Sequence, residues 1–267
     1  AQRPLRRGVK DLSPKAALGA LAVLTAAGAA VRAAGLRTDF WLDEIWNLNI
    51  ARGFGYADIL LRAPYDTNHI LNTLWLRWAG APTWWGFYRL NSLAAGVATI
   101  VLAWRIAARW GRLEGALAAG LVSASYLLTL YSSEARGHAM MVGFALAAFA
   151  SLAAWLRTPS RAAYIGWGLS AGLGLLSHLM FVQAYAAFAP WSAWSLWRRG
   201  RGLARTARAW TLLNAPALGA CAFLYWVQVR GMVHGGGPRL ATAGVLRDTL
   251  AAALGCPDGP WAWGLGA

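Results

Sequence analysis

Charged residues are scarce in this sequence. Only 13% of the 267 residues are Asp, Glu, Lys or Arg, whereas an average soluble domain carries about 25%. Cysteine is rarer still, because Cys221 and Cys256 are the only two and they stand far apart. These shortages argue against an ordinary soluble domain, a disulfide framework and a cysteine-based metal site.

Apolar residues take the place of the missing charges. They make up 58% of the chain, and the mean hydropathy is +0.42. They come in blocks of about 17–25 residues, which is the length that crosses a bilayer as a helix. The sequence therefore predicts an all-α protein: a polytopic transmembrane helical bundle, forming a single domain over 1–267. About seven spans are predicted, at 16–36, 87–104, 115–130, 139–156, 163–177, 179–197 and 209–229.

The basic residues predict how these spans are oriented. If the first span enters from the cytoplasm and the others alternate, 15 of the 25 Lys and Arg residues fall in short cytoplasmic segments, as the positive-inside rule requires. We therefore assign much of the net charge of +15 to orientation and to contact with anionic lipids. Nucleic-acid binding is not expected, because no basic face is interleaved with aromatic residues for stacking.

The acidic residues show the opposite bias, which the positive-inside rule does not explain because it concerns Lys and Arg. Eight of the ten fall in predicted exterior segments. They are Asp39, Asp43, Glu44, Asp58, Asp66, Glu134, Asp248 and Asp258. This excess indicates a functional site on the exterior face.

The two ends of the sequence are unusual. An Ala-rich run at 16–34 follows a basic start, which is also typical of a signal peptide, but the length of the run favours a first span. The chain has no initiator Met, and its last residues, 261–267, are similar to the start of another span. We therefore expect a piece of a longer protein.

The first exterior loop, at about 37–86, is long for a connection between two spans, and such loops are usually functional or disordered. Its helical periodicity favours function. Over 40–48 the apolar residues fall largely on one helical face, and Asp43, Glu44 and Asn47 fall on the other. This pattern predicts a short amphipathic helix on the membrane surface, holding a carboxylate pair at the boundary between lipid and water.

Two further segments carry polar residues that suit a site. A turn is predicted at 64–69, and one of its three polar residues, Asp66 among them, is expected to cap a helix that begins at Ile70. Asp66 is therefore a cap, a site residue or both. The second segment, 131–138, joins the third span to the fourth.

Polar side chains at a membrane boundary are costly unless they are paired or functional. In 131–138, Glu134 and Arg136 form either a surface pair beside an interfacial His138 or part of a site. His178 lies at the predicted exterior turn between the fifth and sixth spans, where a structural role is favoured over a catalytic one.

Taken in order, these motifs resemble the membrane glycosyltransferases of the GT-C superfamily. The resemblance is to the protein mannosyltransferase and aminoarabinose transferase branch, known in bacteria as glycosyltransferase family 39, and it covers about 37–200. It rests on Asp43-Glu44, Asp-x-Asn-His at 66–69, Arg-Leu-Asn-Ser at 89–92 and Ser-Glu-Ala-Arg-x-His at 133–138. The chain departs from the family at Ile70-Leu71, where members commonly have Pro-Pro, and in lacking their C-terminal half.

The resemblance implies transfer of a sugar, with inversion, from a polyprenyl-phosphate donor to a glycan, lipid or protein acceptor. The reaction takes place at the exterior face of a membrane, here expected to be a bacterial cytoplasmic membrane. For this reaction we assign Asp43 as the general base, with Glu44 or Asp66 positioning it. We assign Arg136 to the phosphate, because its planar guanidinium matches phosphate oxygens. Residues expected to assist at the phosphate or the sugar are Glu134, His138, His69 and Asn68.

No obligatory cofactor or metal is expected, although His69 and His138 are also candidate metal ligands. Oxygen and nitrogen donors from Asp43, Glu44, Asp66 and His69 suit a divalent cation.

Two other functions remain open. A transporter or flippase would place ionisable residues near the bilayer midplane on broken helices, and the sequence has few central charges and no internal repeat. The second is a non-catalytic membrane scaffold.

Overall fold

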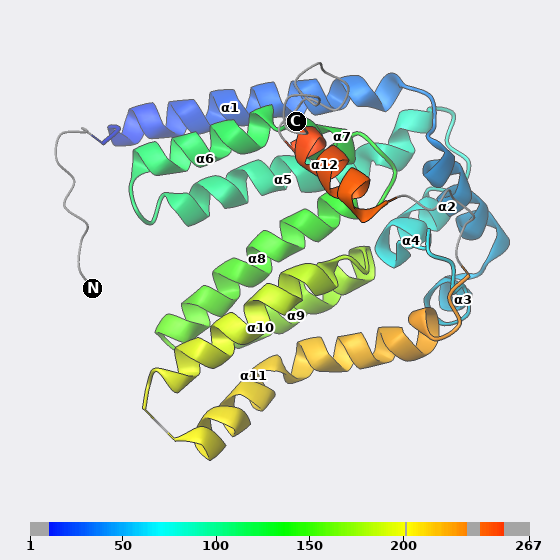
Figure 1. The fold of residues 1–267 in the computed structure, drawn as a ribbon. Helices are drawn as coiled ribbons and strands as arrows, with labels where there is room; N and C mark the ends of the chain where they lie inside the picture. The colour runs from blue at the N-terminus through cyan, green and yellow to red at the C-terminus, as the bar shows by residue number, and fades with distance from the viewer. Residues whose placement is uncertain (1–10, 201, 234–240, 254–267) are drawn as a thin grey trace.

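The computed structural model describes residues 11–200, 202–233 and 241–253, and these residues are almost entirely helical (Figure 1). Within the described chain the β-structure consists of one isolated bridge, between Tyr65 and Val233. The predicted all-α class is therefore confirmed.

Each of the seven apolar blocks is helical. The helices are α1 (Pro14–Ala34), α5 (Leu90–Ala107), α6 (Arg112–Ala124) with α7 (Tyr126–Ser132), α8 (His138–Arg157), α9 (Arg161–Ser177), α10 (Phe181–Trp197) and α11 (Leu203–Leu224). Four helical stretches of the described chain are long and apolar enough to cross a membrane, and the bent pair α6–α7 makes a fifth. These helices indicate an integral membrane protein. The helices α9 and α10 have 17 residues each and are not among these five, so the count of seven spans stays a prediction.

The helices form two groups that meet along α5 and α8. One group contains α1, α5 and α6 with α7, and the other contains α8 to α11 (Figure 1). The largest apolar cluster lies in the second group, where Leu152, Trp167, Phe181 and Leu213 are fully or almost fully buried. Lipid is itself apolar, so close packing rather than exclusion of water holds such helices together.

The predicted exterior loop folds into short helices at one end of the bundle (Figure 1). They are α2 (Leu42–Gly53), α3 (Tyr56–Leu61), α4 (Ile70–Ala79) and the 3-10 turn η2 (Trp85–Arg89), which follows the short turn η1 (Gly35–Arg37) at the end of α1. We call this end of the molecule the loop end. The turns α5–α6, α8–α9 and α10–α11 lie at the opposite end, which we call the basic end because predicted cytoplasmic arginines cluster there.

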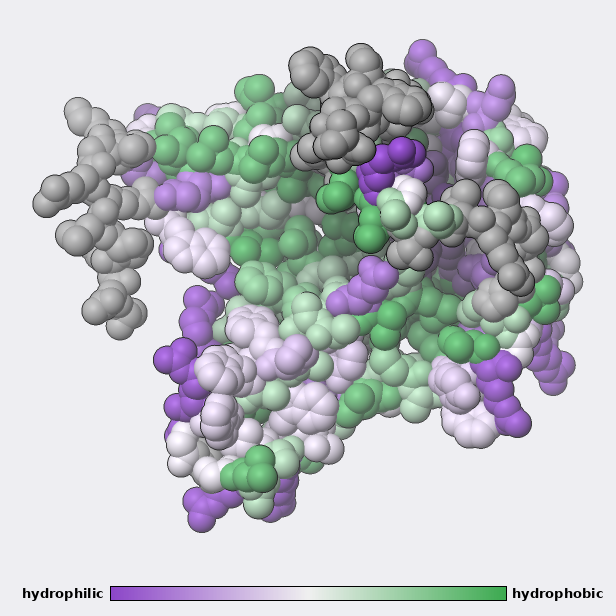
Figure 2. Space-filling model, in the orientation of Figure 1, coloured by the Kyte–Doolittle hydropathy of each residue, from purple (hydrophilic) through white to green (hydrophobic). Residues whose placement is uncertain are grey.

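The distribution of hydropathy over the surface follows these two ends. On the face shown in Figure 2, hydrophobic residues occupy much of the middle, and hydrophilic residues gather mainly towards the left and right edges. The acids Asp39, Asp43, Glu44, Asp58, Asp66 and Glu134 all belong to the segments of the loop end. Asp248 lies in α12 (Thr242–Ala253), and Asp258 lies outside the described residues.

The helix α2 has two different faces as predicted, but Leu48, which was expected on the apolar face, is turned inward with Glu44 and Asn47. Trp41, Leu42, Ile45 and Trp46 are each at least 42% exposed, whereas Glu44 and Asn47 are fully buried. A water-soluble protein arranges such a helix the other way round. The exposed apolar face suits contact with lipid, and the buried polar face serves the site described below.

The predicted cap of α4 is wrong. The N-cap residue is His69, and no side chain accepts a hydrogen bond there. The amide of Asn68 is engaged elsewhere, because its Nδ2 donates to the carbonyl oxygens of Ile59 at 2.9 Å and Ala63 at 2.8 Å. Asn68 therefore closes the turn between α3 and α4 instead of capping a helix.

A buried arginine stabilises the break between α6 and α7, which meet at a 63° bend. The guanidinium of Arg32, from the last turn of α1, donates to the carbonyl oxygens of Val122 at 2.8 Å and Ser123 at 3.3 Å. These carbonyls belong to the last turn of α6, where helix geometry leaves them without a partner. A cation at a helix C-terminus is also favoured by the helix dipole.

Candidate functional site

A buried ion pair between Glu44 and Arg89 organises the loop end. The pair is bidentate, with both N–O distances at 2.7 Å, and neither side chain is more than 2% exposed. Glu44 also accepts the backbone N–H of Ala135 at 2.6 Å and of Trp41 at 2.8 Å. These four hydrogen bonds fill the acceptor positions of a carboxylate. Glu44 therefore has no acceptor left for a substrate.

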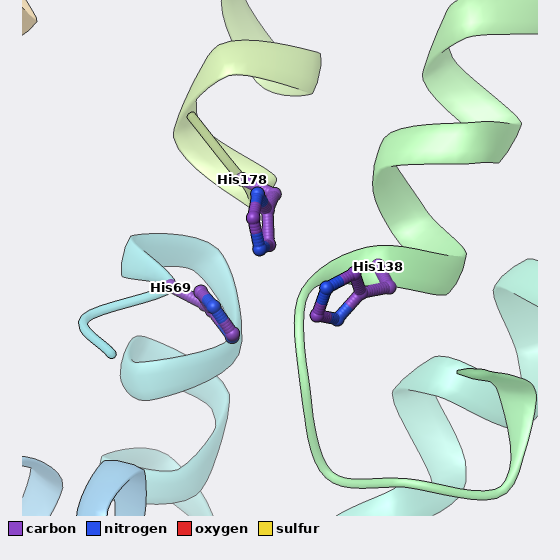
Figure 3. A group of neighbouring side chains, drawn as sticks. All are labelled: His69, His138 and His178. Atoms are coloured by element: carbon purple, nitrogen blue, oxygen red, sulfur yellow. The ribbon is translucent and has the colours of Figure 1, made fainter. Parts of the chain in front are cut away.

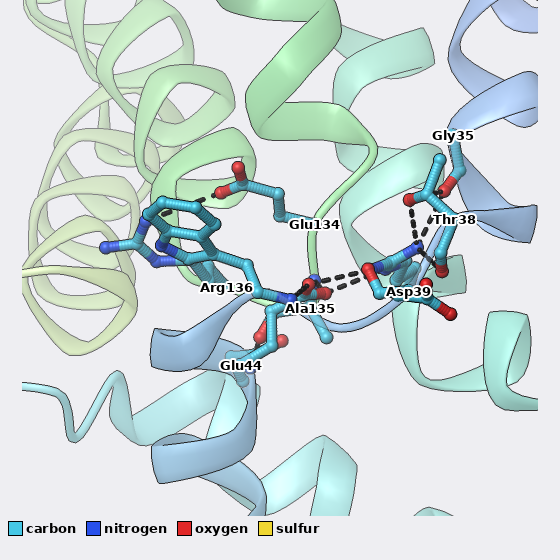
Figure 4. A network of polar contacts seen from close by, with 10 residues as sticks. Gly35, Thr38, Asp39, Glu44, Glu134, Ala135 and Arg136 are labelled. Atoms are coloured by element: carbon cyan, nitrogen blue, oxygen red, sulfur yellow. Dashed lines mark hydrogen bonds and ion pairs between the residues drawn. The ribbon is translucent and has the colours of Figure 1, made fainter.

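Arg89 connects the same pair to the end of α1. Its guanidinium donates to the backbone carbonyls of Gly35 at 2.7 Å, Thr38 at 2.9 Å and Asp39 at 2.8 Å (Figure 4). With its two contacts to Glu44, this arginine has a partner in every direction that its planar group offers. The ion pair thus joins the end of α1, the start of α2, the start of α5 and the 134–137 segment.

Four buried side chains hold the backbone of the 134–137 segment. Glu44 binds the N–H of Ala135, and Asn72 donates to its carbonyl oxygen at 2.6 Å. Ser92 donates to the carbonyl oxygen of Arg136 at 3.0 Å, and His69 accepts the N–H of Gly137 at 3.1 Å. Glu44, Asn72 and Ser92 are fully buried and His69 is 4% exposed. A backbone fixed at so many points presents the side chains of this segment in one orientation.

The presented side chain is that of Arg136, which lies between two carboxylates. Its Nη2 is 2.8 Å from Oδ2 of Asp43. Its Nη1 is 3.4 Å from Oε2 of Glu134 (Figure 4). The Asp43 side chain is 34% exposed and is the most open of the three. Burial raises the pKa of Glu134, an effect that Arg136 opposes. A carboxylate with a raised pKa is a better proton acceptor than one with the ordinary value.

A cavity of about 520 Å³ adjoins this cluster. It lies between the end of α1 and α7, where Val31, Tyr126 and Leu130 give it apolar walls, and it reaches Glu134. An apolar cavity with a few polar groups at one end is the usual form of a site for a small molecule or a lipid-linked group.

Three histidines form a second cluster beside Arg136. His69, His138 and His178 come from separate segments, and their rings face a common space (Figure 3). The ring centroids of His138 and His178 are 4.2 Å apart, and those of His69 and His178 are 4.4 Å apart. Gly137 permits this approach, because a Cβ there would overlap the carbonyl oxygen of Ser177.

His69 and His178, which lie outside the membrane-spanning helices, are held in the neutral state. Burial lowers the pKa of His69 well below its ordinary value, with His178, His138 and Arg136 adding to the effect. Burial and the nearby Arg136 lower the pKa of His178 to about 4. A second cation in this space would be unfavourable next to the guanidinium of Arg136.

The hydrogen bonds of the cluster suit an anion better than a metal. One ligand atom from each ring lies within 4.8 Å of the others, which is compatible with a metal ion. However, Nδ1 of His69 accepts the N–H of Gly137, and Nδ1 of His178 accepts the N–H of Met180 at 3.0 Å. In a neutral ring the proton then lies on Nε2, whereas a metal-bound histidine usually donates from its second nitrogen. His69 and His178 therefore offer N–H donors rather than lone pairs.

The structure brings together some of the predicted site residues and separates others. Asp43, Glu134 and Arg136 meet directly, and His69 and His138 lie beside them. Asn68 is a structural residue of the α3–α4 turn. Asp66 is exposed, and its backbone N–H donates to the carbonyl of Val233 at 3.2 Å.

Sequence reasoning did not assign roles to Arg89, Asn72 and Ser92, which hold the site together. Arg89 and Ser92 belong to the Arg-Leu-Asn-Ser motif at 89–92, so this motif was the available signal. No family model matches the chain, and neither a curated protein nor a solved structure matches it. The function is therefore argued from the geometry of the site and from the sequence motifs.

We predict that Glu44→Gln destabilises the protein by about 3–5 kcal/mol, the usual cost of leaving one partner of a buried ion pair unpaired. Unfolding in detergent micelles, followed by circular dichroism, measures this change. Asp39→Asn removes an exposed carboxylate from the same end and is expected to change stability by less than about 0.5 kcal/mol. Equal effects of the two substitutions would contradict the structural role of Glu44.

A second prediction concerns pH. Because the pKa of His178 falls from 6.5 to about 4 on folding, its contribution to stability is complete above pH 6.5 and is lost as the pH falls towards 4. The loss amounts to at most about 3 kcal/mol. Melting of wild type and His178→Asn between pH 7.5 and pH 4 measures it, and the variant is expected to lose less stability. Parallel curves would show that His178 does not titrate in this way.

Proposed function

We propose that this protein is a membrane glycosyltransferase that takes a sugar from a polyprenyl-phosphate donor and transfers it, with inversion, to an acceptor hydroxyl. The observation that carries the proposal is the position of Arg136, which is held between Asp43 and Glu134 next to an apolar cavity. The order of the four sequence motifs adds support: two of them supply Asp43, Glu134 and Arg136, and the other two hold the 134–137 backbone through His69 and Ser92.

The proposed reaction is a single displacement at the anomeric carbon. Asp43 accepts the proton of the acceptor hydroxyl as its oxygen forms the new bond to this carbon. The bond from the anomeric carbon to the phosphate oxygen breaks, and its electron pair leaves with the phosphate. Arg136 stabilises the departing phosphate with two charge-assisted hydrogen bonds. The phosphate thus competes with Asp43 for Arg136, and its arrival frees the carboxylate.

The other groups of the cluster complete the assignment. Glu134 lies at the polar end of the cavity and is proposed to bind the sugar and to orient Arg136. It is the second candidate for the base, because burial raises its pKa. His69 and His178 offer N–H donors to phosphate oxygens, as argued above, and no obligatory metal is proposed. Glu44 positions the site through its bond to Ala135 and takes no part in the chemistry.

The surroundings suit a lipid-linked donor. The polyprenyl chain is proposed to enter between α1 and α7, where the cavity has apolar walls. The exposed apolar face of α2 is proposed to lie in the membrane interface, which brings Asp43 to the level of the lipid headgroups. With seven spans and the basic end in the cytoplasm, the site faces the periplasm of a bacterial cytoplasmic membrane.

One observation favours a transporter or flippase instead. Broken helices and buried charges are typical of transport proteins, and the α6–α7 break with the buried Arg32 fits this description. However, each of the three nitrogens of the Arg32 guanidinium already donates a hydrogen bond, to Gly28, Val122, Ser123 or Ser132. A cation that caps a helix is not available to a solute, so the enzyme is the better-supported function. Glycosyl transfer itself would separate the enzyme from a non-catalytic scaffold.

The proposal predicts that Asp43→Asn lowers glycosyl transfer by about two orders of magnitude or more, which is the usual contribution of a general base. The measurement uses the full-length protein in proteoliposomes with a panel of polyprenyl-phosphate sugars. Asp58→Asn is the matched control, because Asp58 is a half-exposed acid of the neighbouring α3 that forms an ion pair with Arg62 and belongs to neither the Arg136 cluster nor the lining of the cavity. It is expected to retain nearly full activity.

Two outcomes would change this assignment. If transfer survives Asp43→Asn but is lost in Glu134→Gln, the base is Glu134. If the folded wild-type protein transfers no sugar from any donor of the panel, while the donor is shown to be present in the bilayer, the enzymatic proposal is wrong.

A further inference from the structure

A second cavity lies at the basic end, at the opposite end of the helices from Asp43 and Glu134. Its volume is about 410 Å³. The surface is notched on this side between the ends of α5–α6 and those of α8–α10 (Figure 2). The lining residues are Arg109, Trp110, Phe149, Ala153, Leu156, Arg157, Trp191, Ser195 and Arg199. They come from three segments that lie far apart in the sequence: 109–110 after α5, 149–157 in α8, and 191–199 at the end of α10.

The cavity concentrates positive charge. Arg109, Arg157 and Arg199 all line it, and none of the nine lining residues is acidic. The C-terminal ends of α5, α8 and α10 meet here, each equivalent to about −0.5 of a charge. They offset only about half of the three positive charges, and Arg199 already donates to the carbonyl oxygen of Leu156 at the end of α8. An excess of positive charge around an empty space favours an anion.

The other lining residues indicate what kind of anion fits. Phe149 and Trp191 stack with their ring centroids 5.5 Å apart and their planes inclined at 22°, and Ala153 and Leu156 continue this apolar wall. A free inorganic anion gains nothing from an aromatic and aliphatic wall. A lipid headgroup does, because its phosphate is joined to a glycerol backbone and to acyl chains. Aromatic side chains at the end of an apolar helix also lie at headgroup level in a membrane.

We infer that this cavity is a binding site for an anionic phospholipid, with the phosphate held by Arg109, Arg157 and Arg199 and the acyl chains against Phe149 and Trp191. Arginine suits this role because its guanidinium binds phosphate oxygens in pairs. Basic pockets between membrane helices are known to bind lipid headgroups. The inference does not depend on glycosyl transfer, since the cavity and the acidic site lie at opposite ends of the helices.

The chain provides a control for the general attraction between basic loops and anionic lipids. Arg105, in the last turn of α5, and Arg161, the first residue of α9, are also exposed at the basic end, but they do not line the cavity. A diffuse electrostatic effect depends on the number of charges, whereas a site depends on which charges are removed. The double variant Arg109→Gln/Arg157→Gln and the double variant Arg105→Gln/Arg161→Gln carry the same net charge. Both leave Arg199 and its contact with Leu156 in place.

The test measures binding of phosphatidylglycerol to the delipidated protein in neutral detergent by native mass spectrometry. One tightly held phosphatidylglycerol per chain is expected, with much weaker retention of phosphatidylcholine. The Arg109→Gln/Arg157→Gln variant is expected to bind about tenfold or more weakly, because it loses charge-assisted contacts to the phosphate. The Arg105→Gln/Arg161→Gln variant is expected to bind within about twofold to threefold of wild type, as for charges screened by solvent. Circular dichroism establishes that both variants are folded.

Three outcomes would overturn the inference. Equal weakening in both double variants would show diffuse attraction without a site. Phosphatidylcholine has the same phosphodiester but no net charge. Equal retention of this lipid would show that the cavity does not select for a net negative charge. Displacement of the lipid by millimolar inorganic phosphate would identify a free anion, rather than a lipid, as the ligand.

Discussion

The loop end depends on the buried ion pair between Glu44 and Arg89. Two charges with almost no exposure are stable only when every hydrogen-bonding position is filled, and here backbone groups of the end of α1, the start of α2 and Ala135 fill them. The pair thereby fixes where four separate segments meet. Because α2 must turn Glu44 inward, Trp41, Leu42 and Ile45 point outward, so the same constraint gives the helix its exposed apolar face.

The position of the functional groups follows from this arrangement. Asp43 is the neighbour of Glu44 on α2, and Arg136 is the neighbour of Ala135, so the ion pair brings the two together at 2.8 Å. The histidine cluster is tied to the same segment through Gly137. The result is a positive group between two acids with neutral N–H donors nearby, which is an arrangement suited to a phosphate that leaves while a proton is taken up. The basic cavity is the counterpart at the other end, where three arginines lack acidic partners within the lining.

Much of the fold was predictable because its signals are local. Apolar runs of sufficient length gave the helices, and the periodicity of 40–48 gave α2 with its two faces. The roles of Asp43 and Glu44 were harder to separate, because successive residues of a helix differ by about 100° in direction and only tertiary contacts decide which one is buried. Arg89 and His178 contact residues that are far away in the sequence. A single sequence does not indicate which distant residues come into contact, so these two contacts could not be predicted. The break at Ser125 was missed for the same reason, since the stabilising Arg32 comes from α1.

Photo-crosslinking tests most directly whether the cavity at the loop end holds a lipid-phosphate sugar donor. A polyprenyl-phosphate sugar with a diazirine on its first isoprene unit would be added to the protein in proteoliposomes, and the labelled peptides would be identified by mass spectrometry. If the cavity holds the donor, the label falls on α1 and α7 near Val31 and Leu130, which line the cavity, and unlabelled polyprenyl phosphate reduces the labelling by competition. Labelling that falls on other helices, or that polyprenyl phosphate does not reduce, would contradict binding of the donor in this cavity.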